Sequence, residues 1–555
     1  MSEFLKKIPS RPPGWAFTAV ALAAFALVLS TYVAGWSPKY GITRFINIGE
    51  VFNQRGIAAY RATPKYVGSP WGFDGQHYAE IALDPLLRDP QIRTAIDNTP
   101  YRARRILLPW LAWAGGMGRP FWVLNIYAAL NPIFWLGYAA ILIALFRPQG
   151  WAGLAGLAAM LMTCGVMESM MNSLTDFPSF VVMMLAMVVG GLGGAGWMTV
   201  SALIRPENSL LALPALFEYD PPWGRALARN VLMGVIAVAP LALWMAYLLW
   251  RLRGMSLTVA GEHNLDWPMH AIYLKSVDIR LMMREGRIHW SKVFFSLYKS
   301  YDMNALLTVV STMTQCLYVL THRDWRNRLW RMGALFVPFF ICLGYQIWFS
   351  HFTVTRHALP ITLAFNLILA MRPRRTWALW FLMGNCFVPF GIYDFYRSGH
   401  LAYPREEFAT AGGGEAREPV GALFGKGWSN PEWDSRDTWR WAVDQQTSIT
   451  LTNPGPLALK VELDFVSQSL VPRDLRVVVR GSAVWLGRLE HKNQAVATLP
   501  FSLPPGETTV NFVTSQPAVA ATMTDLRELA FMVAEPRVTV IEPAAGSSES
   551  PTGRK

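Results

Sequence analysis

Residues 15–36 read WAFTAVALAAFALVLSTYVAGW, and this apolar stretch decides the fold that we expect for the chain. A helix that spans the hydrocarbon core of a bilayer needs about 20 such residues. Lys6, Lys7 and Arg11 precede the stretch, which is too long for the core of a signal peptide. We therefore expect an uncleaved anchor whose N-terminus faces the cytoplasm.

Comparable apolar segments follow as far as about residue 394. The chain is 52% hydrophobic and 16% charged, whereas soluble proteins are about 25% charged. We expect further spanning helices at 121–146, 150–171, 177–196, 231–250, 304–321, 332–350, 357–371 and 376–394. The sequence therefore excludes a plain soluble enzyme and predicts a polytopic α-helical membrane protein of about 9–11 spanning or re-entrant helices.

Two shorter apolar segments do not fit a simple count of spans. Residues 106–118 form a helix of only about 20 Å, so we expect this segment to be re-entrant or interfacial. Residues 197–217 contain Arg205, Pro206 and Glu207, and Pro disrupts a helix while charges rarely face lipid. We expect that segment to be broken at these residues.

Charge gives the expected orientation. The net charge is +13, and basic clusters flank the apolar segments, at Arg323, Arg326, Arg328 and Arg331 and at Arg372, Arg374 and Arg375. Such clusters typically face the cytoplasm, which places 37–105 and everything after about 394 outside. The basic excess thus needs no nucleic-acid partner, and all four cysteines lie in apolar segments, which leaves none for a zinc cluster.

The composition changes after residue 396. Residues 397–420 contain Gly412, Gly413 and Gly414 and several charges, and they are typical of a linker. Short runs of alternating apolar and polar residues then follow, as at 457–465, and these predict half-buried strands. We expect a β-sandwich or jelly roll over 421–541 and a disordered tail over 542–555. Tryptophans open this domain, and they could stack on sugars or simply fill the core.

Two motifs lie between the first and second predicted spans. Residues 71–85 read WGFDGQHYAEIALDP, and residues 98–109 read NTPYRARRILLP. From the residues alone, the first motif could be a turn that leads into an amphipathic helix, with Asp74 as the helix cap.

The two motifs together resemble bacterial integral-membrane glycosyltransferases of the GT-C superfamily. The matching patterns are Asp-Gly-Gln-x-Tyr-x-x-Ile-Ala from Asp74 and Tyr-Arg-x-x-Arg-Ile-Leu-x-Pro from Tyr101. Residues 174–176 and 204–207 are similar to weaker helix-end signatures of the same group. The resemblance covers roughly residues 14–394, and it gives 1–396 as a GT-C-like transmembrane domain.

The resemblance implies a membrane glycosyltransferase of the bacterial inner membrane. Its partners would be a polyprenyl-phosphate-linked sugar as donor, a lipid or glycan as acceptor, and membrane lipids, with the site and the β-domain in the periplasm. Asp74 matches the acidic residue that acts on the acceptor. A carboxylate within hydrogen-bond reach can take the proton of an attacking sugar hydroxyl, so Asp74 is the expected general base.

The departing phosphate gains negative charge, so we expect cations opposite it. The candidates for holding the donor phosphate are Arg102, Arg105, Arg356 and His357. The candidates for shaping the site or contacting the acceptor are Gln76, His77, Tyr78, Asp176, Arg205 and Glu207. Interfacial anchoring, a surface helix and structural ion pairing are alternative roles for these charges.

The sequence identifies no certain cofactor. No paired acids can be assigned to Mg²⁺, and metal dependence varies across the superfamily, so a divalent cation stays open. Two other classes of function also stay open: a transporter or flippase for lipid-linked glycans, and a non-catalytic scaffold whose β-domain binds glycan. A transporter often carries internal repeats, and the sequence contains none that we detect.

Overall fold

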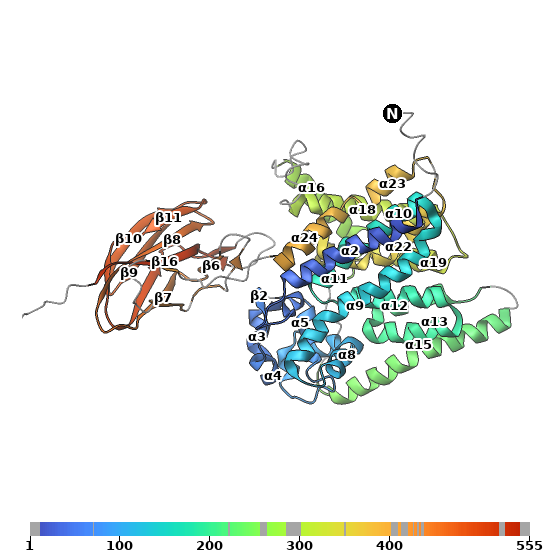
Figure 1. Cartoon of the computed structure of the whole chain (residues 1–555), viewed down its shortest axis with the longest axis horizontal. Helices are drawn as coiled ribbons and strands as arrows, with labels where there is room; N and C mark the ends of the chain where they lie inside the picture. The colour runs from blue at the N-terminus through green and yellow to red at the C-terminus, as the bar shows by residue number, and fades with distance from the viewer. Residues whose placement is uncertain are drawn as a thin grey trace, which may run out of the picture. The chain divides into compact units, whose positions relative to one another are not determined.

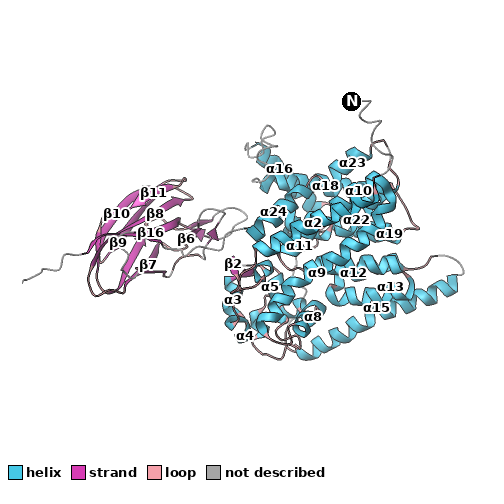
Figure 2. Ribbon diagram, viewed as in Figure 1, coloured by secondary structure: helices cyan, strands magenta, loops and turns pink. Residues whose placement is uncertain are grey.

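The structure is a computed structural model of the whole chain. It describes residues 12–69, 72–219, 223–255, 264–284, 301–348, 351–373, 375–400, 409–411, 420–425, 427–429, 432–433, 438–520 and 528–543. The chain divides into two compact units, Met1–His400 and Leu401–Lys555. Figure 2 shows that helices dominate the first unit and strands the second.

The first unit is a bundle of helices. Its helices outside the first loop are α2 (Gly14–Ala34), α9 (Pro120–Phe146), η2 (Arg147–Gln149), α10 (Gly150–Leu161), α11 (Cys164–Met171), α12 (Asp176–Val189), α13 (Gly191–Ile204), α14 (Pro206–Ala212), η3 (Leu213–Leu216), α15 (Trp223–Arg251), α16 (His270–Arg284), α18 (Tyr301–Thr321), α19 (Arg328–Ile341), α20 (Tyr345–Trp348), α21 (His351–His357), α22 (Leu359–Met371), α23 (Trp377–Gly384) and α24 (Val388–His400).

The loop after α2 folds into short elements that gather at one end of the bundle (Figure 1). They are η1 (Thr43–Ile46), β1 (Ile48–Gly49), α3 (Glu50–Arg55), α4 (Ala58–Ala62), β2 (Val67–Ser69), α5 (Gly75–Ile81), α6 (Ile92–Ala95), α7 (Thr99–Arg102) and α8 (Leu107–Gly115). Strands β1 and β2 pair in parallel. This loop is therefore an ordered cap that carries both sequence motifs.

Five segments of the described residues are long and apolar enough to cross a membrane: Gly14–Ala34, Pro120–Met171, Gly224–Arg251, Asn304–Thr321 and Trp377–His400. Three shorter apolar helices are α12, α13 and α22. Several predicted spans are shorter than expected because helices end inside them. For example, α12 ends at Gly190, whose φ of 69° continues no right-handed helix.

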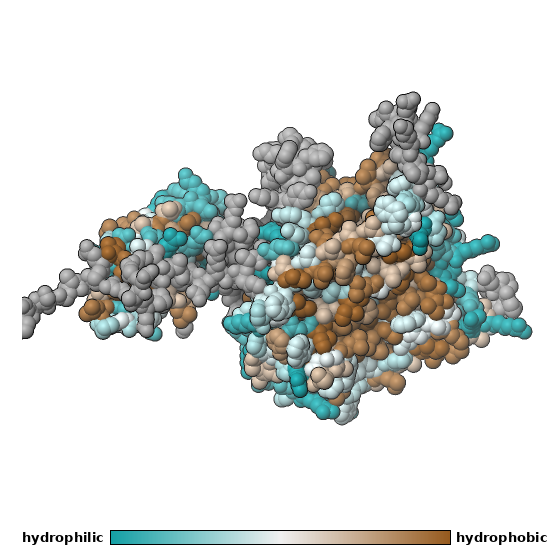
Figure 3. Space-filling view, viewed as in Figure 1, coloured by the Kyte–Doolittle hydropathy of each residue, from teal (hydrophilic) through white to brown (hydrophobic). Residues whose placement is uncertain are grey.

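Large apolar side chains on the surface of this unit fit a bilayer. Leu22 on α2 is 60% exposed, Leu243 on α15 is 73% exposed and Leu382 on α23 is 66% exposed. Figure 3 shows apolar side chains across much of the visible face of the helical unit. An apolar surface this broad is costly in water and favourable in lipid. The first unit is therefore a polytopic helical membrane domain.

The two ambiguous segments are short or broken. Residues 106–118 form only the short helix α8. In residues 197–217, α13 ends at Ile204, Arg205 has an extended φ of −152°, and Pro206 begins α14. Proline at the first helical position has no N–H to lose, so the chain breaks where the sequence predicted.

The second unit consists mainly of two β-sheets. One has the order β10 (Ser482–Leu489), β9 (Arg473–Val479), β13 (Gly506–Val513), β7 (Gln446–Asn453) and β4 (Gly421–Phe424). The other has the order β11 (Gln494–Ala497), β8 (Leu459–Ser469), β16 (Phe531–Pro543), β6 (Thr438–Trp441) and β5 (Glu432–Trp433), with β12 (Phe501–Leu503) on β8 and β3 (Ala409–Ala411) on β16. A further pair joins β14 (Val519–Ala520) to β15 (Glu528–Leu529).

Alternation along the strands builds one core between the sheets. On β8, Val461, Leu463 and Phe465 are buried, and they share a core with Val477 of β9 and Phe512 of β13. A half-buried strand shows this period of two. The expected β-domain is therefore present as a two-sheet sandwich.

The tryptophans and the ends of this unit are also informative. Trp428 packs against Phe424, Phe512 and Phe531, so it fills the core. Helix α24 runs to His400 and β3 occupies Ala409–Ala411, both within the range 397–420 that we expected as linker. Most of the rest of that range lies outside the described residues, as does 544–555 of the expected tail.

Candidate functional site

Asp74 lies immediately before α5, where its carboxylate is free to make contacts outside the helix. Asp74 occupies the N-cap position of α5, as the sequence suggested, but its backbone is helical and its side chain makes no capping hydrogen bond. At Gly75, a Cβ would lie 2.0 Å from the carbonyl oxygen of Asn172. Only glycine permits this approach, which brings Asp74 against the C-terminal end of α11.

Two arginines from distant parts of the chain bind the Asp74 carboxylate. Oδ1 lies 3.1 Å from Nη2 of Arg102, and Oδ2 lies 3.2 Å from Nη1 of Arg356. Arg102 also binds Asp97, with nitrogen–oxygen distances of 2.7 and 3.0 Å. The first loop and α21 therefore meet at a single carboxylate.

A second, deeper acid continues this network. Asp176 Oδ1 lies 2.6 Å from Arg205 Nη1, and its Oδ2 lies 3.7 Å from Arg356 Nη1. Arg205 Nη2 lies 3.2 Å from Nε2 of His357. His357 Nδ1 lies 2.8 Å from the carbonyl oxygen of Thr353. Since Nδ1 must then donate its proton, Nε2 accepts from Arg205.

Arg105 forms a third branch. It is 2% exposed, and it donates to the hydroxyl oxygens of Tyr78 and Tyr101. Its Nη2 also lies 3.5 Å from Oε1 of Glu207. Tyr101 and Arg105 of the second motif thus hold Glu207, at the start of α14, against the first loop.

The turn between α11 and α12 positions Asp176. Asn131 Nδ2 donates to the carbonyl oxygen of Leu174 over 3.1 Å, and the Tyr127 hydroxyl donates to that of Ser173 over 3.0 Å. Ser173 has a φ of 47°, which an L-residue adopts rarely. Interhelical hydrogen bonds therefore fix a strained turn beside the site.

Buried polar groups hold the segment around Asp74 against α11 and β1. Asn47 Nδ2 donates to Oδ1 of Asn172 over 2.7 Å, and Asn172 Nδ2 donates to Oε1 of Glu168 over 2.9 Å. Gln76 accepts from the backbone N–H of Gly49 over 2.9 Å. These contacts join α11, α5 and β1 into one rigid wall.

Electrostatics keeps Asp74 and Asp97 of the first loop ionised. Burial alone would raise the pKa of Asp74, but the guanidinium groups of Arg102, Arg356 and Arg105 outweigh it and hold that pKa well below its usual range. Burial likewise opposes ionisation of Asp97, whose pKa the Arg102 contacts lower. Burial lowers the pKa of His77 to about 4. His77 is therefore neutral at pH 7.

The positive and negative charges of the site are balanced in number, but several of its hydrogen-bond donors have no acceptor. The four guanidinium groups of Arg102, Arg105, Arg205 and Arg356 face the four carboxylates of Asp74, Asp97, Asp176 and Glu207. Among the described residues, the Nε atoms of Arg105, Arg205 and Arg356 are buried without an acceptor. Buried donors without partners are costly, so these arginines retain capacity for a further oxygen ligand.

The candidate residues from the sequence converge at this site. Arg102, Arg105, Arg205 and Arg356 contact acids, and His357 contacts Arg205. Tyr78 accepts from Arg105, while His77 lies 3.7 Å from Asp97 and packs its ring edge-on against Phe52. Gln76 differs, because its side chain accepts a hydrogen bond from the backbone N–H of Gly49.

Sequence analysis missed two contributors, Asp97 and Tyr101. Asp97 stands five residues before Arg102, and Tyr101 stands directly before it. An acid so close to a basic motif in the same loop was the available signal. Within the described part of the chain, no group of three or more His, Cys, Asp or Glu side chains lies where it could hold a metal ion.

Comparisons with known proteins give only a weak structural likeness. No protein-family model matches the chain. No curated protein matches it. Among solved structures, the chain is similar to the arabinosyltransferase EmbB from Mycobacterium smegmatis, with a TM-score of 0.23 and 12% identity, over 94% of this chain and 64% of that one. The match thus spans less than two thirds of that protein.

The function must therefore be argued from the site. It combines a partly exposed carboxylate, arginines with unused donors, and buried tyrosines. Such a set can bind a phosphate through charge-assisted hydrogen bonds. It can also accept a proton from a hydroxyl beside that phosphate.

Proposed function

We propose that the chain is a membrane glycosyltransferase that moves a sugar from a polyprenyl-phosphate donor to a glycan or lipid acceptor. Asp74 acts as the general base. Arg102, Arg105 and Arg356 bind the donor phosphate, with His357 holding Arg205 in place. The reaction takes place at the periplasmic face of a bacterial inner membrane.

The observation that carries the proposal is the pair of ion pairs that Arg102 and Arg356 form with the carboxylate of Asp74. The Asp74 side chain is 28% exposed, whereas that of Asp176 is 2% exposed. An acceptor hydroxyl can reach the first carboxylate and not the second. Asp74 is therefore the base, and Asp176 holds Arg205 and Arg356 in position.

Donor binding also explains how so acidic a carboxylate can act as a base. Charges at the site are balanced before a donor arrives, so the donor phosphate must compete with Asp74 for Arg102 and Arg356. As the guanidinium groups turn to the phosphate, Asp74 loses their stabilisation and its proton affinity rises. Donor binding thereby activates the base.

In the transfer step, one bond forms, one bond breaks and one proton moves to Asp74. The acceptor oxygen forms a bond to the anomeric carbon of the sugar while the bond between that carbon and the phosphate oxygen breaks. Asp74 takes the hydroxyl proton, and the polyprenyl phosphate leaves with an additional negative charge. Arg102, Arg105 and Arg356 stabilise that charge as it develops.

A transporter for lipid-linked glycans would use the same arginines, but it needs no proton acceptor. A scaffold whose β-domain binds glycan would need neither the acid nor the arginines. Trp428 fills the core of the β-domain, which removes one aromatic platform for sugar from the scaffold hypothesis. The arrangement of Asp74 and its arginines favours transfer.

The test is a mass-spectrometric analysis of lipid-linked glycans in a strain that lacks the gene, complemented with variants. Asp74→Asn keeps the size of the side chain but takes no proton, so the unextended acceptor and unused donor should accumulate as in the deletion. Asp84→Asn is the matched control, because Asp84 accepts from the backbone N–H of Asp89 in the same loop and lies away from the arginines. Full restoration by Asp74→Asn would overturn the proposal.

A further inference from the structure

A second group of arginines lines a pocket at the other end of the helical unit from the site. The pocket has a volume of about 1620 Å³ and includes Met187 and Val188, at the C-terminal end of α12. Asp176 begins the same helix. With a rise of about 1.5 Å per residue, Val188 lies about 18 Å along the axis from Asp176, so this pocket is separate from the proposed active site.

The pocket carries an excess of positive charge. Its lining includes Arg323, Arg326, Arg328 and Arg331 but one acid, Glu218. Glu218 Oε1 is already bound to Arg229 over 3.1 Å. Arg331 is held in the wall, because it donates to the carbonyl oxygens of Ala215 and Phe217.

Arg326 and Arg328 are differently placed. Among the described residues, neither has a carboxylate oxygen within the 4.0 Å of an ion pair, and neither side chain donates a hydrogen bond to one. Arg328 is the first residue of α19. Cations are unfavourable at the positive, N-terminal end of a helix. A bound anion would therefore reduce both the repulsion between Arg328 and the helix dipole and the repulsion between Arg326 and Arg328.

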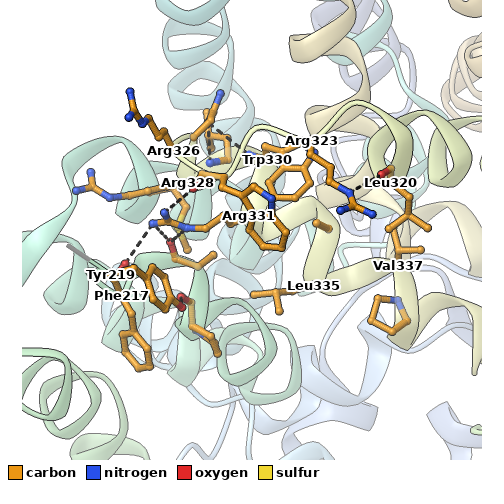
Figure 4. Close-up of a pocket in the computed structure, with 18 of the residues that line it drawn as sticks. Phe217, Tyr219, Leu320, Arg323, Arg326, Arg328, Trp330, Arg331, Leu335 and Val337 are labelled. Carbon is orange, nitrogen blue, oxygen red and sulfur yellow. Dashed lines mark hydrogen bonds between the residues drawn. The ribbon is translucent and has the colours of Figure 1, made fainter. Parts of the chain in front are cut away.

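Most of the rest of the lining is apolar. Leu335, Val337 and Ile341 extend the pocket along α19, and Figure 4 shows Leu335 and Val337 on the side away from Arg326 and Arg328. Trp325 and Tyr219 stand at the rim and are 65% and 49% exposed. Trp and Tyr at such a boundary are typical of the membrane–water interface.

We propose that this pocket binds an anionic phospholipid of the adjoining leaflet, with its phosphate on Arg326 and Arg328 and an acyl chain against Leu335 and Val337. Charge complementarity selects the anion, and the apolar wall selects a lipid. Ligand pockets of about 300–1,000 Å³ suit small molecules, so a free phosphate would leave most of this volume unfilled. Basic pockets between membrane helices bind anionic head groups in this way.

The proposal is tested with the full chain in nanodiscs that contain phosphatidylcholine and phosphatidylglycerol. Native mass spectrometry counts the molecules of each lipid that stay bound. The wild type should retain phosphatidylglycerol over phosphatidylcholine. Arg326→Gln with Arg328→Gln should reduce that preference about tenfold or more, as expected for the loss of two charge-assisted contacts.

A matched control has Arg225→Gln with Arg375→Gln, since both arginines are exposed and lie outside the pocket lining. This variant should keep the wild-type preference. Equal retention of both lipids by the wild type, or an unchanged preference in Arg326→Gln with Arg328→Gln, would overturn the proposal. If glycerol phosphate without acyl chains displaces the lipid at equal concentration, the pocket takes a free phosphate, and the lipid assignment is wrong.

Discussion

The two groups of arginines differ in how they are balanced. Around Asp74, Arg105, Arg205 and Arg356 are buried, and each lies within 4.0 Å of an acid. In the pocket beside α19, Arg326 is exposed and Arg328 is half-buried, and neither has an acidic partner among the described residues.

This difference follows from desolvation. An unpaired charge costs several kcal/mol when it leaves water, so the buried arginines require acids, whereas the exposed ones do not. A ligand at the first site must therefore compete with carboxylates that are already bound. A ligand at the pocket meets unopposed charge, and its binding is correspondingly sensitive to salt.

The largest effect expected from this comparison is on stability. Asp176→Asn leaves Arg205 and Arg356 buried with one acid fewer, which should destabilise the protein by about 3–5 kcal/mol. Arg328→Gln removes an unpaired charge and should change stability by about 0.5 kcal/mol or less. Thermal unfolding of both variants in the same detergent measures the difference. Similar unfolding temperatures would mean that the acids around the site do not compensate buried charge.

An effect on binding should follow for the arginines that hold the donor. Arg356→Gln removes a charge-assisted contact worth about 1.5–3 kcal/mol, so donor affinity should fall roughly ten- to a hundredfold. Arg88→Gln is the control, because Arg88 is exposed in the first loop and, within the described part of the chain, forms no hydrogen bond or ion pair with the residues of the site. Isothermal titration with a polyprenyl-phosphate sugar measures both. Unchanged affinity in a folded Arg356→Gln variant would assign Arg356 to structural ion pairing with Asp74 and Asp176.

A third expected effect is a pH dependence in the first loop. Burial raises the pKa of Glu80 to about 7, while its Oε1 accepts from the backbone N–H of Ile57 over 2.7 Å. Between about pH 4.5 and 7 the folded state therefore holds more protons than the unfolded state, so stability falls as pH rises through that window.

Glu80→Gln stays neutral and keeps the acceptor, so it should flatten that fall. The gain above pH 7 should be about 3 kcal/mol at most. Unfolding temperatures of the wild type and the variant at pH 5 and pH 8 test this prediction. Parallel slopes for the two proteins would show that Glu80 is ionised throughout.

Local sequence patterns predicted which helices and strands form better than they predicted where each helix ends. Apolar runs marked the helices, and alternation marked strands such as β8, because burial on one face imposes a period. The end of α12 was missed, since it depends on Gly190 adopting a positive φ, whereas the break after α13 was predicted from Arg205 and Pro206.

The site shows the same limit more clearly. Asp74 and Arg356 stand 282 residues apart, and nothing in the periodicity of either segment joins them. The sequence singled out both residues, but their ion pair results from the packing of α21 against the first loop. The roles of Asp97 and Tyr101 likewise emerged only from their contacts with Arg102 and Arg105.

The central claim is that Asp74 competes with the donor phosphate for arginines and then takes the acceptor proton. Measuring donor affinity and single-turnover transfer on purified Asp74→Asn tests both parts together. The account predicts that donor binding tightens severalfold, because a competitor for Arg102 and Arg356 is gone, while transfer slows about a hundredfold or more. Weaker donor binding with a transfer rate close to that of the wild type would contradict it.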